Sequence, residues 1–172
     1  NRKQEEKKFQ ELQELLKSNG VLEKGEKLVI FTEHKDTLLY LEERLTKSGG
    51  YNVATIHGGK NVDDRRAAQW AFAKPDTQIL LATDAAGEGI NLQFCRLLIN
   101  WDIPWNPNRL EQRMGRIHRY GQKQDVLVFN MVAGNTKEGK VLERLLSKLD
   151  IIREGMGDDR VYDVIQDVLE GV

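Results

Sequence analysis

The segment Gln112–Arg119 (QRMGRIHR) is the part of the sequence best suited to do chemistry, because it gathers three arginines and no acidic residue. In a helix, residues three and four apart are neighbours, so Gln112, Arg116 and Arg119 would share one face. Guanidinium groups present planar forks of N–H donors that match phosphate oxygens, and Gly115 removes a side chain where a ligand must come close. The segment therefore predicts a phosphate-binding helix face. The alternative, a solvated basic helix end, is the usual reading of a shorter R-x-x-R pattern.

Three further segments follow apolar runs that read as strands. Ile56–Gly59 ends one such run, Thr83–Asn91 ends another, and the loop Trp101–Pro107 leads from a third into the arginine segment. In an open parallel sheet, ligands bind beyond the carboxyl ends of the strands. Gly87 and Gly89 would let the backbone approach a phosphate closely. These segments are therefore expected to meet the arginine helix at one edge of a sheet.

Other kinds of site find little support in the sequence. The three histidines His34, His57 and His118 lie in separate segments, and there is no Cys-x-x-Cys pair, so no metal site is predicted. His57 is expected to be a structural hydrogen-bonding residue. The segment Gly20–Lys27 misses the Gly-Lys-Ser/Thr of a phosphate-binding P-loop and reads as a turn. No nucleophile motif of the Gly-x-Ser-x-Gly type is present.

Short apolar runs alternate with amphipathic segments, which predicts an α/β domain with a mainly parallel sheet. The expected strands span residues 27–32, 52–57, 78–83, 96–101 and 125–132, and the expected helices span residues 2–17, 36–47, 63–72 and 109–119. In the first helix a narrow apolar stripe predicts packing on the domain edge, or on a part of a longer protein. In the third helix Ala67, Trp70 and Ala71 are expected to face inward. A heavy apolar stripe over residues 141–152 and another over 161–169 predict a helical C-terminal extension.

The bulk composition is that of an ordinary globular domain. The chain has 172 residues, of which 40% are hydrophobic and 31% charged, and its formal net charge is −1. Any nucleic-acid footprint must therefore come from local clustering of charge. The single cysteine, Cys95, excludes an internal disulfide and is expected to be a buried structural thiol. No apolar run is long enough to span a membrane, and the first residue, Asn1, suggests a piece of a longer protein.

Five stretches together resemble a known family: KLVIFTEHKDTL, IHGG, ATDAAGEGINLQ, NWDIPWNP and QRMGRIHRYGQ. They are similar to the second RecA-like lobe of superfamily 2 helicases, and more narrowly to the Swi2/Snf2 group of DNA translocases in its bacterial and archaeal form. The resemblance covers residues 26–150. It implies a RecA-like three-layer domain over residues 26–135, preceded by an N-terminal helix and linker (1–25) and followed by a brace-like helical extension (136–172).

The family's motif VI, Q-x-x-G-R-x-x-R, is matched by Gln112, Gly115, Arg116 and Arg119. The resemblance implies that Arg116 and Arg119 reach the γ-phosphate of ATP bound on the other lobe, with Arg119 as the arginine finger. Gln112 is placed with them as catalytic. Gly115 is expected to lie against the nucleotide.

Motif V is matched by Thr83–Gln93. The resemblance implies nucleotide contacts by Gly87, Glu88, Gly89 and Asn91, the last near the ribose. It implies contacts with the DNA backbone by residues of motif IV, of the segment after His57 and of motif V: Thr32, Gly58, Gly59, Lys60, Arg65 and Thr83. The alternative for Arg65 is an intramolecular salt bridge. Such phosphate contacts would carry no base sequence information.

The P-loop lysine and the Asp-Glu-x-His box of the first lobe are absent, so the chain carries half of an ATP site. We expect it to be the second motor lobe of an ATP-dependent double-stranded-DNA translocase, inactive alone. The implied cofactor is ATP with Mg²⁺ held by the first lobe. The implied partners are that lobe and duplex DNA, in the cytoplasm of a prokaryote. Two alternatives stay open: a lobe of an RNA or strand-separating DNA helicase, and a non-catalytic protein-interaction module.

Overall fold

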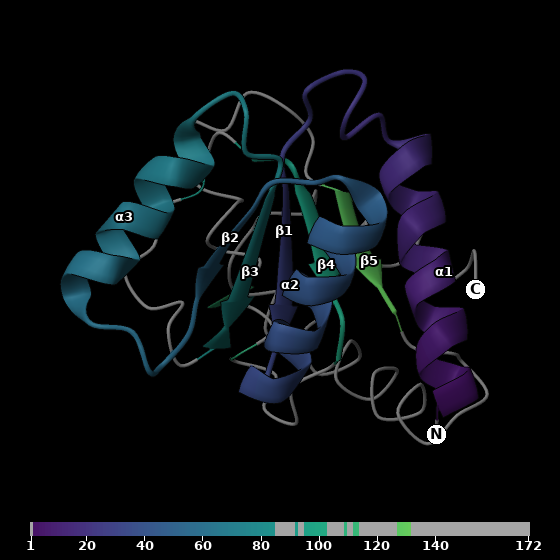
Figure 1. Cartoon of the computed structure of the whole chain (residues 1–172), viewed down its shortest axis with the longest axis horizontal. Helices are drawn as coiled ribbons and strands as arrows, with labels where there is room; N and C mark the ends of the chain where they lie inside the picture. Colours follow the sequence, from purple (N-terminus) through teal and green to yellow (C-terminus); the bar gives the residue numbers. More distant parts are fainter. Residues whose placement is uncertain are drawn as a thin grey trace, which may run out of the picture.

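The computed structural model describes residues 2–84, 92, 95–102, 109, 112–113 and 127–131 (Figure 1). The C-terminal extension predicted for residues 136–172 lies outside the described residues. Within them, a central sheet is flanked by helices, as predicted for a RecA-like α/β domain.

The sheet is parallel throughout its described strands. Its strand order is β2-β3-β1-β4-β5, and the strands are β1 (Leu28–Thr32), β2 (Val53–Ile56), β3 (Ile79–Thr83), β4 (Leu97–Asn100) and β5 (Leu127–Asn130). Every residue of β1, β3 and β4 is buried, which explains why these strands are continuous apolar runs rather than alternating ones. The predicted strands are confirmed, and the first four are one or two residues shorter than expected.

Three helices are described: α1 (Arg2–Ser18), α2 (Lys35–Gly49) and α3 (Val62–Ala73). Gly50 ends α2 in the left-handed conformation at φ 66°, where glycine has no steric cost. Asn61 begins α3, because its side chain accepts a hydrogen bond from the backbone N–H of Asp64 at 2.8 Å. At the other end of α3, the ammonium of Lys27 donates to the carbonyl oxygens of three residues, Phe72, Lys74 and Thr77.

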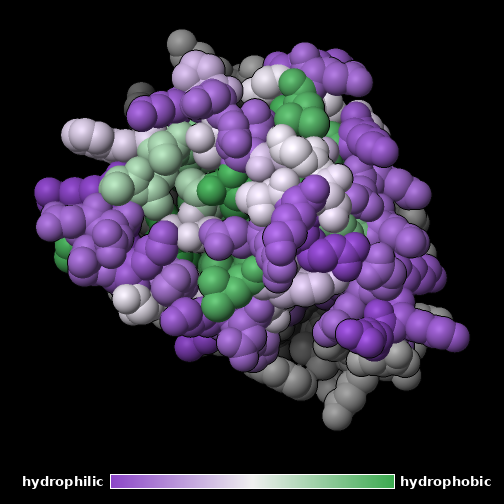
Figure 2. All heavy atoms as spheres, viewed as in Figure 1, coloured by the Kyte–Doolittle hydropathy of each residue, from purple (hydrophilic) through white to green (hydrophobic). Residues whose placement is uncertain are grey.

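The helices cover both faces of the sheet. The connections β1-α2-β2 and β2-α3-β3 run in opposite directions along the sheet, and right-handed crossovers therefore place α2 and α3 on opposite faces. The α1 helix shares the face of α2, where Phe9, Leu12 and Leu16 are at most 1% exposed. This core joins them to alternate strand residues and to the inner side of α2: Leu28, Ile30, Ile79, Leu81, Leu97, Ile99, Leu38, Leu41 and Leu45. The outer surface of this side is mostly hydrophilic, with small separate apolar patches (Figure 2).

The inward face predicted for α3 is wrong. Trp70 is 77% exposed, whereas Ala68 and Phe72 are buried. The apolar residues of α3 are spread around most of its circumference, so their spacing fits more than one face. The position of β2 beneath the helix decides that Phe72, and not Trp70, enters the core.

None of the helices in the described residues is long and apolar enough to cross a membrane. Cys95 is fully buried, and this burial raises the pKa of its thiol to about 12. The prediction of a structural thiol is therefore confirmed.

Candidate functional site

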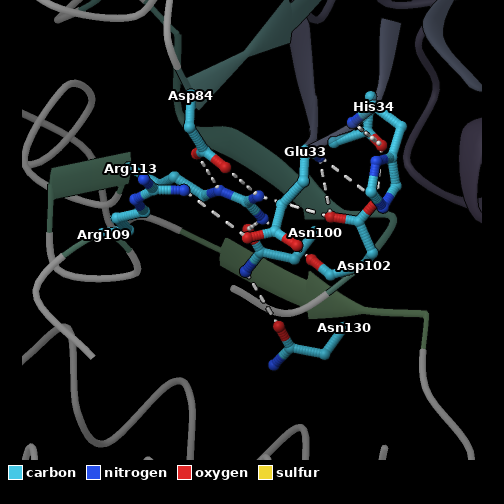
Figure 3. Close-up of polar contacts among 9 residues, drawn as sticks. Glu33, His34, Asp84, Asn100, Asp102, Arg109, Arg113 and Asn130 are labelled. Carbon is cyan, nitrogen blue, oxygen red and sulfur yellow. Dashed lines mark hydrogen bonds and ion pairs between the residues drawn. The ribbon is translucent and has the colours of Figure 1, made fainter. Parts of the chain in front are cut away.

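The side chain of Arg113 is buried at the carboxyl edge of the sheet, where it is only 1% exposed (Figure 3). Its guanidinium binds both carboxylate oxygens of Asp84, with Nε–Oδ1 at 2.5 Å and Nη2–Oδ2 at 2.7 Å. Asp84 directly follows β3. The fork of donors on arginine matches the two oxygens of a carboxylate, which fixes the orientation of both groups.

Asp102, which lies two residues beyond β4, is the second acid bound by Arg113. Its backbone carbonyl accepts from Nη1 at 2.8 Å, and its carboxylate lies 3.4 Å from Nη2. The same carboxylate accepts the hydroxyl of Thr32 and, at 3.0 Å, the backbone N–H of Glu33. Asp102 therefore joins the end of β1 to Arg113.

A line of amides extends this network across the sheet. Arg113 Nη1 donates to Asn100 Oδ1 at 3.1 Å, and Asn100 Nδ2 donates to Asn130 Oδ1 at 2.8 Å. The guanidinium also lies 5.6 Å from the centre of the Phe31 ring. We call the set Thr32, Asp84, Asn100, Asp102, Arg113 and Asn130 the Arg113 network. Each of β1, β3, β4 and β5 carries or directly precedes a member.

Among the described residues, three carboxylates lie around the network, those of Glu33, Asp84 and Asp102. Burial raises the pKa of the Glu33 carboxyl, and the negative charges of Asp102 and Asp84 raise it further. Arg109, which is helical and 55% exposed in its side chain, lies 3.8 Å from a Glu33 oxygen. Arg113 is therefore the buried positive charge on which the neighbouring carboxylates depend.

A second group of polar residues lies at the carboxyl end of β2. His57 Nδ1 accepts the backbone N–H of Gly59 at 3.1 Å, which confirms the expected structural hydrogen bond. A Cβ at position 59 would lie 3.2 Å from the imidazole of His57 and 3.4 Å from the Lys35 ammonium, so both side chains lie close to the glycine. Burial and the charges of Lys35 and Lys60 lower the pKa of His57. Lys60 Nζ also donates to the carbonyl of Thr55 at 2.7 Å.

Two buried polar atoms have no hydrogen-bond partner among the described residues: Thr83 Oγ1 and Arg65 Nε. Thr83 is only 4% exposed, and it lies beside Thr32 in the register of β1 and β3. No ion pair of Arg65 occurs in this part of the chain, so the predicted alternative of a salt bridge gains no support. Unsatisfied buried polar atoms are uncommon in folded proteins and call for a functional or structural reason.

The predicted site residues are only partly described. Gln112 is helical and exposed beside Arg113. Thr32 and Thr83 end neighbouring strands, Gly58, Gly59 and Lys60 follow β2, and Arg65 belongs to the first turns of α3. The remaining ones lie outside the described residues: Gly87, Glu88, Gly89, Asn91, Gly115, Arg116 and Arg119.

Sequence reasoning missed Arg113, Asp84, Asp102 and Lys35. A signal was present for the acids, since Asp84 and Asp102 each follow a buried strand, and two carboxylates at one sheet edge require a cation. No group of three or more potential metal ligands occurs in the described part of the chain. Arg113 takes the position between the two aspartates.

Comparison with known proteins decides the family. Residues 7–121 match the model of the helicase conserved C-terminal domain. The chain belongs to this family. It is 42% identical over 144 residues to the uncharacterized ATP-dependent helicase YqhH of Bacillus subtilis, and 34% identical over 149 residues to the RNA polymerase-associated protein RapA of Sodalis glossinidius. These alignments cover 82% and 85% of this chain, but only 25% and 15% of the relatives' lengths.

The fold comparison agrees with the family. The C-terminal part of the Fun30 ATPase domain matches with a TM-score of 0.72 and 29% identity, over 79% of this chain and 44% of that one. The sequence-based identification as a second RecA-like lobe of Swi2/Snf2 type is thus confirmed. This helicase C-terminal domain spans a quarter or less of these two curated relatives.

Proposed function

We propose that this helicase C-terminal domain is the second motor lobe of an ATP-dependent double-stranded-DNA translocase. In this proposal Arg119 is the arginine finger, and Arg116 and Gln112 act beside it on the nucleotide. The location is a prokaryotic cytoplasm. The domain boundaries after residues 25 and 135 remain part of the proposal.

The observation that carries the proposal is the burial of Arg113 beside the exposed Gln112. A buried guanidinium held by Asp84, Asn100 and Asp102 fixes the start of the motif VI segment at the carboxyl edge. This is the edge at which open parallel sheets bind ligands. A lobe used only for protein contact has no need for this arrangement beside a run of further arginines.

The chemistry of the donor set fits a phosphate. Arg116, Arg119 and Gln112 supply guanidinium and amide N–H donors, and phosphoryl transfer is accelerated when such donors meet the charge on the transferred group. Gly87, Glu88, Gly89, Asn91 and Gly115 are proposed to line the nucleotide. Bound ATP supplies the phosphoanhydride whose cleavage drives the motor, with Mg²⁺ on the first lobe. The residues of this chain bind and orient it.

The proposed nucleic-acid contacts lie at the ends of β2 and β3. Thr83 Oγ1 and Arg65 Nε have no partner among the described residues, and Gly58 and Gly59 expose backbone beside the cations Lys35 and Lys60. Unsatisfied donors and cations of this kind suit the phosphates of a DNA strand. The hydroxyl of Thr32 is bound by Asp102. Thr32 is therefore proposed to support DNA binding indirectly, by holding the carboxyl end of β1 in position.

The test uses a protein in which this domain is joined to an ATP-binding first lobe. ATP hydrolysis is measured with and without duplex DNA, for the parent and for the Arg119→Ala variant. Loss of an arginine finger costs roughly 10³–10⁵-fold in rate. We expect DNA-stimulated turnover that collapses in the variant while ATP binding persists.

Two results would change the proposal. Unchanged turnover in the variant would show that motif VI is not catalytic here, and an interaction module would then be favoured. Equal stimulation by RNA and duplex DNA would favour a helicase lobe acting on RNA or on separated strands. The isolated domain is expected to hydrolyse no ATP above the level of its own Arg119→Ala variant.

A further inference from the structure

Arg113 connects two strand ends that lie on the proposed nucleic-acid side of the lobe. Asp84 directly follows Thr83, and it holds the guanidinium through both of its oxygens. Asp102 holds the same guanidinium (Figure 3). Its carboxylate also accepts the hydroxyl of Thr32. The ends of β1 and β3 are therefore attached to the segment that carries Gln112.

We propose that Arg113 is a positioning residue, which keeps the motif VI arginines in register with the nucleic-acid edge of the lobe. It contacts neither ligand and acts through Asp84 and Asp102. The inference rests on the proposed function and extends it, since it names the connection by which a grip on DNA could affect ATP turnover.

The geometry explains why an arginine is needed at this position. The guanidinium satisfies Asp84 at two points and reaches Asn100 and the Asp102 carbonyl on another edge, which leaves one orientation for the side chain. A lysine would supply the charge but not the planar fork. Arg113 precedes Arg116 by three residues, so a shift of its backbone would be passed along the predicted helix to the proposed catalytic groups.

Arg113→Lys therefore separates charge from geometry. In the protein joined to its first lobe, we expect the kcat of DNA-stimulated ATP hydrolysis to fall roughly 10²-fold, the scale of a displacement of about 1 Å at a reacting centre. The KM for ATP should change by less than about twofold, because contacts with the ground state are retained. The matched control is Arg96→Lys, since Arg96 forms a partly buried ion pair with Glu26 at the opposite end of β4. That variant should keep the parent kcat.

A rescue variant keeps the test decisive if Arg113→Lys is poorly folded. Asp84→Glu lengthens the acid by one methylene group and lets it reach the shorter lysine head, so the double variant should regain thermal stability. If Arg113 sets the position of motif VI, kcat stays low in the refolded double variant. If Arg113 only neutralises charge, kcat returns together with stability, and the inference is overturned.

Parallel measurement of Arg119→Ala separates this inference from the proposed function. Full activity of Arg113→Lys, with Arg119→Ala inactive, would overturn the positioning role alone. The same loss in Arg113→Lys and Arg96→Lys would also overturn it, because the effect would then be general. Absence of DNA-stimulated turnover in the parent would overturn the proposed function, and the positioning role with it.

Discussion

Thr32 and Thr83 end neighbouring strands, but only the hydroxyl of Thr32 has a hydrogen-bond partner among the described residues. Both residues are buried, at 1% and 4% exposure, and they are paired in the register of β1 and β3. The hydroxyl of Thr32 donates to Asp102, whereas that of Thr83 has no partner in the described part of the chain. At the same sheet edge, the threonine that ends β1 therefore has a structural role, whereas the threonine that ends β3 carries a hydroxyl with no described partner.

The same contrast separates two arginines. Arg113 uses its donors on Asp84, Asn100 and Asp102, and Arg65 keeps a buried Nε that no described residue accepts. Satisfied donors hold the edge in one shape, and unsatisfied donors are available to a ligand. The comparison indicates that the buried cation Arg113 is suited to hold the edge together, and we propose that ligand contacts fall to donors without described partners, such as Arg65 Nε.

The largest expected effect is that of Arg113→Met. This change leaves Asp84 and Asp102 without their shared cation, and breaking a buried ion pair on one side costs about 3–5 kcal/mol. Urea unfolding of the domain should show this loss in the free energy of unfolding. Arg96→Met is the control, because its pair with Glu26 is a quarter exposed and should cost about 1 kcal/mol or less. Equal losses would mean that the Arg113 network contributes no more to the stability of the domain than the partly exposed pair of Arg96 and Glu26.

The two threonines should respond to valine with opposite signs. Thr32→Val removes a donor from Asp102 and should destabilise the domain by about 1–3 kcal/mol. Thr83→Val replaces a buried hydroxyl that has no described partner with a methyl group and should stabilise the domain by about 1 kcal/mol. Thermal unfolding of both variants tests the comparison directly. Destabilisation by Thr83→Val would show that this hydroxyl has a partner after all.

Arg65 and the adjacent exposed Arg66 form a matched pair for nucleic-acid binding. Arg65→Met should change the free energy of unfolding by no more than about 0.5 kcal/mol, since no described bond is lost. It should reduce the slope of log affinity for duplex DNA against log salt concentration by about 1, which corresponds to the loss of one phosphate contact. Arg66→Met serves as the control for general charge and should leave the slope nearer its original value. Equal slopes for both variants would argue for diffuse attraction rather than a placed contact.

The smallest expected effect is a pH dependence at His57. Its pKa is lowered in the folded protein, so the folded state disfavours the imidazolium. The contribution of His57 to stability is therefore complete above its unfolded pKa of about 6.5 and is lost as the pH falls through that value toward the folded pKa. Unfolding measured at pH 8 and pH 5.5 should show a smaller difference in His57→Gln than in the parent. Added duplex DNA should raise the pKa of His57 in an NMR titration, if a phosphate lies beside Gly59.

Much of this architecture could be predicted from sequence. The continuous apolar runs around Val29, Leu80 and Leu98 predicted buried strands, and the alternation of strands with helices predicted a mainly parallel sheet. Phe9, Leu12 and Leu16 predicted a packed stripe, and the structure buries all three. The α3 helix was predicted, but its buried face could not be, because its apolar residues allow more than one inward face and only contact with the sheet selects one.

In the candidate site, too, some features could be predicted from the sequence and others could not. The identities of Gln112, Arg116 and Arg119 predicted phosphate chemistry because guanidinium and amide N–H donors that share one helix face match phosphate oxygens. By itself the sequence determined the alternation of strands and helices and the family, and it supplied the donor residues for which an anionic ligand is proposed. Only the tertiary structure decided that Arg113 is buried between Asp84 and Asp102 and that the hydroxyl of Thr83 has no partner among the residues that the structure describes. These outcomes depend on which strand ends become neighbours, and the strand order β2-β3-β1-β4-β5 brings together residues that are up to 70 positions apart.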